Sequence, residues 1–140
     1  MTGVDPKARR VLVVEDNDDC RQLIALFLSR MGCDVITATN GLEGVEKAVF
    51  EHPQLILMDL KLPKLGGIEA TSQLKENPAT REIPVVICTA FGPEAYQDTA
   101  LLDHAAEIVQ KPIKLEIFQR LLVKYLPAPA QAAQDSARIQ

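Results

Sequence analysis

Five side chains suited to phosphoryl chemistry stand at or just after the ends of short apolar runs: Glu15, Asp16, Asp59, Thr89 and Lys111. Three carboxylates held close together repel one another unless a cation or protons bind among them. Hard oxygen ligands that leave room for water suit Mg²⁺, and a carboxylate beside Mg²⁺ can attack phosphorus. A lysine ammonium and a threonine hydroxyl can bind phosphoryl oxygens. The set therefore indicates magnesium-dependent phosphoryl chemistry at one of these carboxylates, if the fold brings these residues together.

The apolar runs that precede these residues are predicted strands. Runs that are apolar without alternation are typical of strands covered on both faces, as in a parallel sheet. We expect five strands, at residues 11–14, 34–38, 55–58, 84–88 and 106–109.

Amphipathic segments separate the predicted strands. Apolar residues recur with a helical period at Cys20, Leu23, Ile24, Phe27, Leu28 and Met31. Gly32 then provides a left-handed cap, and Asn40 with Glu43 forms the pattern of a capping box. Gly66-Gly67 supplies backbone freedom for a turn. Further helices are predicted near residues 68–74, 93–100 and 115–125.

Alternating strands and helices predict an α/β fold with a five-stranded parallel sheet. The common doubly wound (βα)5 arrangement is flavodoxin-like, with strand order 2-1-3-4-5 and helices on both faces. In this order the strands that carry the acidic residues, the threonine and the lysine are neighbours. Their carboxyl ends form one rim, which is where ligands bind in open α/β sheets.

Length and composition set the remaining limits. A chain of 140 residues with 47% hydrophobic and 24% charged residues is expected to form one globular domain. The net charge of −4 argues against nucleic-acid binding. No apolar run has membrane-spanning length, and no signal segment is apparent, so we expect a cytoplasmic protein. Residues 1–8 are expected to be flexible, and the Pro-, Ala- and Gln-rich residues 127–140 to be disordered.

The chain resembles the receiver domain of two-component response regulators over residues 9–126. The resemblance rests on spaced motifs that occur in the expected order. They are Val11-Leu-Val-Val-Glu-Asp16, Leu57-Met-Asp59-Leu-Lys-Leu-Pro63 with Gly66-Gly67, Val86-Ile-Cys-Thr89-Ala90, and Lys111-Pro112.

The resemblance implies specific roles for the site residues. Asp59 would be the phosphoacceptor, with Thr89 and Lys111 as ligands of the phosphoryl group. Mg²⁺ would be held by Asp16, by Asp59 and by the backbone carbonyl of Lys61, while Glu15 would act mainly through water. The family also suggests a cis Lys111–Pro112 bond.

The function implied is phosphorelay signalling by a stand-alone receiver. A sensor histidine kinase or a phosphotransfer protein would donate the phosphoryl group, and the modified protein would change its binding to an unidentified downstream protein. Direct DNA binding and membrane association are not expected. The chain would catalyse only its own phosphorylation and dephosphorylation, so it is not expected to be an enzyme in the usual sense.

Three alternatives stand beside this interpretation. Ile108 occupies the position where the family usually has an aromatic residue, which keeps open a phosphorylation-independent interaction module. A phosphatase acting through an aspartyl phosphate would need a second Asp two residues after the nucleophile, where this chain has Lys61. A flavodoxin-like cofactor binder would gain nothing from an acidic rim beside its phosphate.

Overall fold

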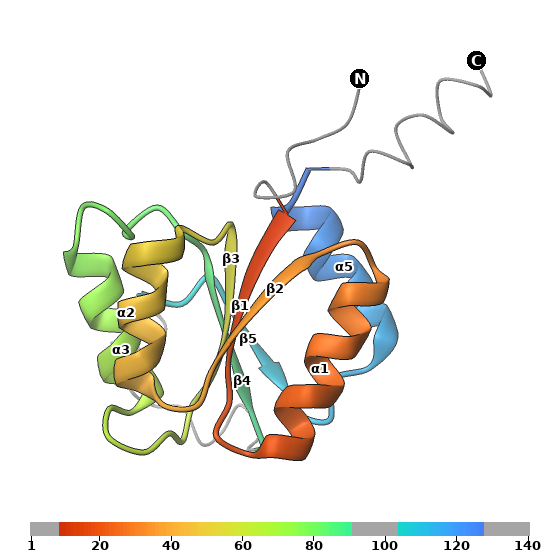
Figure 1. The fold of residues 1–140 in the computed structure, drawn as a ribbon, viewed down its shortest axis with the longest axis horizontal. Helices are drawn as coiled ribbons and strands as arrows, with labels where there is room; N and C mark the ends of the chain where they lie inside the picture. Colours follow the sequence, from red (N-terminus) through yellow and green to blue (C-terminus); the bar gives the residue numbers. More distant parts are fainter. Residues whose placement is uncertain (1–8, 91–103, 128–140) are drawn as a thin grey trace.

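The computed structural model describes residues 9–90 and 104–127. Five parallel strands form one sheet, with two described helices on each face (Figure 1). The strands are β1 (Arg10–Val14), β2 (Asp34–Ala38), β3 (Leu55–Asp59), β4 (Val85–Thr89) and β5 (Glu107–Gln110). The described helices are α1 (Asp18–Arg30), α2 (Gly41–Glu51), α3 (Gly67–Glu76) and α5 (Leu115–Tyr125).

The strand order is β2-β1-β3-β4-β5, which confirms the predicted topology. Every neighbouring pair is parallel. The last strand begins one residue later than predicted, at Glu107. The predicted helix at 93–100, the segment 1–8 and nearly all of the tail 127–140 lie outside the described residues.

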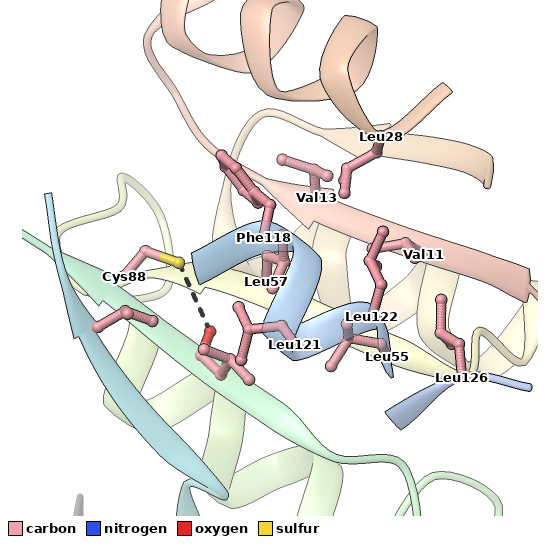
Figure 2. Close-up of a cluster of buried hydrophobic side chains, with 12 residues drawn as sticks. Val11, Val13, Leu28, Leu55, Leu57, Cys88, Phe118, Leu121, Leu122 and Leu126 are labelled. Carbon is pink, nitrogen blue, oxygen red and sulfur yellow. Dashed lines mark hydrogen bonds between the residues drawn. The ribbon is translucent and has the colours of Figure 1, made fainter. Parts of the chain in front are cut away.

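Alternate residues of each central strand contribute to two separate cores. Val11 and Val13 of β1 belong to the core beneath α1 and α5, together with Phe118 and Leu121 (Figure 2). Leu12 and Val14 point the other way, into the core covered by α2 and α3. Because both faces of β1, β3 and β4 are buried, these three strands are apolar over most of their length, and this explains why their sequences showed no alternation.

Asparagine side chains begin the first two helices. Asn17 Oδ1 accepts the Cys20 N–H at 2.9 Å, and Asn40 Oδ1 accepts the Glu43 N–H at 2.8 Å. The Glu43 carboxylate reaches back to the N–H of Thr39 at 2.6 Å, one residue before the cap. The predicted capping pattern is therefore present in a slightly shifted form.

The buried face of α1 is narrower than its apolar stripe. Phe27 and Leu28 pack on the core, with the Phe27 ring 6.3 Å from that of Phe118. Cys20 is exposed and Leu23 is 52% exposed, so the first two residues of the apolar stripe do not pack on the core. The reason is their position in the first half of α1, beside the rim formed by the carboxyl ends of the strands. Gly32, which follows the helix, has a φ of 87° as predicted for its cap.

Arg9 joins two segments at the opposite end of the sheet. Its guanidinium is buried and donates to the carbonyls of Met31 at 3.1 Å and Gly32 at 3.2 Å, where α1 ends. It also donates to the carbonyl of Pro127, just beyond α5. One side chain thus satisfies carbonyls at the ends of two helices.

Among the described residues, no helix combines the length and apolar character needed to cross a bilayer.

Candidate functional site

Strand ends bring the predicted site residues into one pocket. Asp59 and Thr89 are the last residues of β3 and β4, Glu15 follows β1, and Lys111 follows β5. The pocket has a volume of about 430 Å³. Its walls include all six residues that the sequence singled out: Glu15, Asp16, Asp59, Lys61, Thr89 and Lys111.

Glu15 and Lys111 form the buried polar centre of the pocket. Glu15 is only 3% exposed, and the Lys111 ammonium donates a hydrogen bond to its Oε1. Its other oxygen accepts the Asn17 N–H at 3.2 Å. The same ammonium lies 3.5 Å from Oδ2 of Asp59. Each oxygen of the buried Glu15 carboxylate therefore has a partner, as a buried charge requires.

This arrangement separates the acidities of the two carboxylates. Burial and the nearby negative charge of Glu15 raise the pKa of Asp59 to about 6. Burial would also raise the pKa of Glu15, but hydrogen bonds from Lys111 and Asn17 lower it below its usual value. For Lys111, burial lowers the pKa, and the two carboxylates more than offset this, so the net pKa is raised.

The start of α3 packs against the loop that follows Asp59. Gly67 donates its N–H to the Leu60 carbonyl at 3.0 Å. A Cβ atom on Gly67 would lie 2.3 Å from the main-chain oxygen of Asp59. Gly66 has an ordinary φ of −67°, and the positive φ in this loop belongs to Lys64, at 67°. What this loop requires of Gly67 is space beside Asp59; the turn itself is made at Lys64.

The acidic side chains suit a divalent cation. Oxygens of Glu15, Asp16 and Asp59 lie within 4.8 Å of one another. Carboxylate oxygens beside a pocket with room for water are the donor set that Mg²⁺ prefers. The residues present therefore fit a magnesium ion.

The Lys111–Pro112 peptide bond is cis, as the family resemblance suggested.

An apolar groove adjoins the acidic pocket. It has a volume of about 370 Å³ and lies between residues 20–27 of α1 and residues 111–118, which join β5 to the start of α5. Leu23 and Phe27 line it from α1, and Ile113 and Phe118 line it from the other side. Cys20, Ala90 and Lys111 contribute to both cavities, so the groove and the acidic pocket share an edge.

Sequence reasoning missed three residues at this site. Asn17 caps α1 and donates to Glu15, Cys20 lines both cavities, and Arg21 donates to the main-chain oxygen of Glu15 at 2.9 Å. The spacing of Asp18 and Arg21 on one helix was a possible signal, since charges three residues apart can pair. The contact of Arg21 with the backbone of the preceding loop left no mark in the sequence pattern.

The fold and the acidic rim together define a receiver domain of two-component signalling. A family model described as the response regulator receiver domain matches residues 11–122. The chain belongs to this family.

The chain is similar to named response regulators and receiver domains over most of its length. It is 33% identical over 118 residues to the polar-differentiation response regulator DivK of Brucella ovis, covering 84% of this chain and 96% of that protein. The receiver domain of the sensor histidine kinase PA1611 from Pseudomonas aeruginosa, solved with a magnesium ion in its active-site cleft, has a TM-score of 0.78 and 28% identity, covering 84% of this chain and 96% of that one.

A third relative was solved with a signalling partner. The receiver domain of the Saccharomyces cerevisiae response regulator Ssk1, in complex with the histidine phosphotransfer protein Ypd1, has a TM-score of 0.73 and 28% identity. The similarity covers 83% of this chain and 87% of that one.

Proposed function

We propose that residues 9–126 form a cytoplasmic receiver in which Asp59 accepts a phosphoryl group from a phosphohistidine. The observation that carries this proposal is the position of the Asp59 carboxylate in a pocket that also holds Glu15, Asp16 and Lys111. In the transfer, an oxygen of Asp59 forms a bond to phosphorus and the phosphorus–nitrogen bond of the donor breaks. The electron pair of the broken bond remains on the imidazole nitrogen.

The chain's own residues divide the work of this transfer. Lys111, 3.5 Å from Asp59, places a positive charge where phosphoryl oxygens would lie, and the Thr89 hydroxyl would donate a hydrogen bond to the same group. Asp16, Asp59 and the Lys61 main-chain carbonyl would hold the magnesium ion, with Glu15 acting through water. When bound, magnesium offsets the negative charge that gathers on the oxygens during transfer.

A protein that carries phosphohistidine is the partner that this chemistry implies, either a sensor histidine kinase or a phosphotransfer protein. The donor imidazole must approach Asp59 from the rim. The surface of the donor protein must therefore contact the residues that border the rim. The apolar groove beside the acidic pocket, with Leu23 exposed at its edge, supports docking of the donor there. The solved complex of the Ssk1 receiver with Ypd1 supports a phosphotransfer protein as one such donor.

The consequence of phosphorylation is a change in partner binding. A phosphoryl group on Asp59 adds negative charge within reach of Lys111, which is paired with Glu15 before the transfer. Competition between the phosphoryl group and Glu15 for this one ammonium would shift the segment that begins at Lys111. A downstream protein that distinguishes the two states would complete the signal.

The decisive experiment is the intact mass of the protein after incubation with acetyl phosphate and Mg²⁺. We expect a gain of one phosphoryl group in the wild type and in Asp19→Ala, an exposed control on α1. The gain should be lost in Asp59→Ala and when the metal is chelated. A wild type that acquires no phosphoryl group under these conditions would favour the phosphorylation-independent interaction module instead.

A further inference from the structure

Arg21 is a largely buried charge close to the acidic pocket with no part in the chemistry described above. Its side chain is 14% exposed, although it lies near the start of α1. The guanidinium donates to the main-chain oxygen of Glu15 at 2.9 Å and pairs with the Asp18 carboxylate. Arginine is seldom buried to this extent without partners that fix its position. Arg21 therefore ties α1 to the loop that carries the acidic pair.

The oxygen that Arg21 holds belongs to the peptide unit between Glu15 and Asp16. On the preceding side, the Glu15 N–H donates to the carbonyl of Ala38 at 3.0 Å. A peptide unit is planar, so fixing its oxygen also fixes the direction in which its nitrogen and the next Cα lie. The direction from which the Asp16 side chain departs is thus set in part by Arg21.

Asp16 needs this support more than Glu15 does. The Glu15 carboxylate is held directly by Lys111 and by the Asn17 N–H. Asp16 is exposed, and among residues 9–90 and 104–127 no group donates a hydrogen bond to its carboxylate. Its orientation toward the neighbouring acidic oxygens therefore depends on its backbone.

We propose that Arg21 is a positioning residue of the magnesium site, because it holds the Glu15–Asp16 peptide so that the Asp16 carboxylate faces the ion. The inference rests on the proposed function, in which Asp16 is a magnesium ligand. Groups that orient metal ligands without touching the metal commonly change metal affinity by about 10–100-fold.

Positioning and simple charge effects predict opposite results. A positive charge near a cation site disfavours the cation, so if Arg21 acted through its charge alone, its removal would tighten magnesium binding. If Arg21 positions Asp16, its removal weakens binding in spite of the lost repulsion. The sign of the change in Kd therefore separates the two roles.

The test is a calorimetric titration of the full chain with MgCl₂. We expect Arg21→Ala to raise the magnesium Kd by about tenfold. Arg21→Lys keeps the charge but loses the forked donor geometry, so its Kd should rise by at least about threefold. Arg30→Ala, an exposed arginine at the far end of the same helix, should match the wild type.

A double-mutant cycle locates the effect. In an Asp16→Asn background, Arg21→Ala should change the magnesium Kd by less than about twofold, because the residue it positions is already altered. An undiminished tenfold effect in that background would show that Arg21 does not act through Asp16. A Kd that is unchanged or tighter in both Arg21→Ala and Arg21→Lys would overturn the proposal.

Two further measurements separate effects on folding and on phosphorylation from the effect on magnesium binding. Urea unfolding of each variant establishes that it is folded at the titration temperature, and Arg21→Lys carries the test if Arg21→Ala is not. With acetyl phosphate, Arg21→Ala should reach the wild-type level of phosphorylation once Mg²⁺ exceeds the raised Kd. A wild type that binds Mg²⁺ but takes up no phosphoryl group would refute the proposed function and leave the positioning result standing.

Discussion

The ammonium group of Lys111 is hydrogen-bonded to Glu15 and stands 3.5 Å from the nearer oxygen of Asp59. One cation thus serves two carboxylates unequally. Glu15 has the closer contact with the Lys111 ammonium, and the pKa of Glu15 is lowered in spite of its burial. For Asp59, the effects of burial and of the Glu15 charge outweigh the attraction to Lys111, so the pKa of Asp59 is raised to about 6. The acid proposed as the phosphoacceptor is therefore the more easily protonated of the two.

Glu15→Gln should lower the pKa of Asp59. The substitution removes the nearby negative charge that raises this pKa and frees Lys111 to pair with Asp59. Carbon-13 NMR titration of the carboxyl groups without Mg²⁺ should place the Asp59 pKa well below 6, closer to its usual 3.8. Glu43→Gln on α2 is the control and should leave it in place. An Asp59 pKa that stays near 6 in Glu15→Gln would show that burial alone accounts for it.

Asp59→Asn should stabilise the metal-free protein above pH 6. Because the Asp59 pKa is near 6 when folded and 3.8 is its usual value, the folded state holds a proton more tightly. The stability from this group is fully present below about pH 4 and is lost as pH rises through 6. We expect a gain of about 1–3 kcal/mol at pH 8 in Asp59→Asn, since one pKa unit is about 1.4 kcal/mol.

Urea unfolding in EDTA, at several pH values, measures this difference. The curves of wild type and Asp59→Asn should converge toward pH 4, where the wild-type carboxyl is protonated. A gain that is the same at pH 4 and pH 8 would assign the effect to packing and contradict the titration argument.

Glu107→Gln should destabilise the protein in a pH-dependent way. The Glu107 carboxylate accepts hydrogen bonds from Arg120 at 2.9 Å, Lys124 at 3.0 Å and the Tyr125 hydroxyl at 2.6 Å, joining α5 to β5. Although burial would raise its pKa, these bonds lower it to about 2, against a usual 4.5. The stabilisation is therefore present above about pH 4.5 and is lost as pH falls toward 2.

We expect a loss of about 1–2 kcal/mol at pH 7, limited because Arg120 and Lys124 are about half exposed. The difference from wild type should shrink as the pH is lowered. Denaturant titration measures it, with Glu46→Gln, an exposed carboxylate of α2, as the control. Equal losses for the two variants would show that the contacts of Glu107 add nothing.

Gly67→Ala should be costlier than Gly66→Ala. At Gly67 a Cβ would lie 2.3 Å from the Asp59 carbonyl oxygen, so the backbone beside Asp59 must move. At Gly66 the nearest atom, at 2.5 Å, is the end of the flexible Glu69 side chain, which can swing away. We expect about 1–3 kcal/mol of lost stability and slower phosphorylation for Gly67→Ala only. Similar losses in both variants would contradict the argument from space.

Leu23→Glu should impair transfer from a protein donor and spare transfer from a small one. Leu23 lines the apolar groove, whereas Leu26, also exposed on α1, does not. A carboxylate in the groove would oppose an apolar partner surface, and we expect at least a tenfold loss of transfer from a phosphohistidine protein. Acetyl phosphate should phosphorylate Leu23→Glu at the wild-type rate. Leu26→Glu is the matched control, and equal effects of the two substitutions would remove the groove from the interface.

Local patterns predicted most of the fold because strand and helix signals are short-range. Val11 to Val14 are buried on both faces, and an unbroken apolar run is what such a strand needs. The parallel order then followed from the alternation of elements, and with it the convergence of Asp59 and Lys111 at one rim. These inferences use chain order and apolar spacing only, and both are visible in the sequence.

What escaped prediction depends on contacts between distant segments. Leu23 shares the apolar spacing of Phe27, yet no described element covers it beside the rim. The glycine pair was expected to turn the chain, whereas Gly67 is needed for clearance from Asp59. The reach of Arg21 back to a main-chain oxygen depends on the angle at which α1 leaves the sheet. Neither clearance nor approach angle is encoded in local spacing.

Arg9 lies at the end of the sheet opposite the acidic rim. Arg9 precedes β1 and binds the Pro127 carbonyl, so both described ends of the chain meet at the amino ends of the strands. The acidic rim is at the other ends, about 17 Å away for a strand of five residues. A group attached next to Arg9 or Pro127 would therefore lie at the end of the sheet opposite the acidic rim. The face proposed to accept the phosphoryl group would stay uncovered.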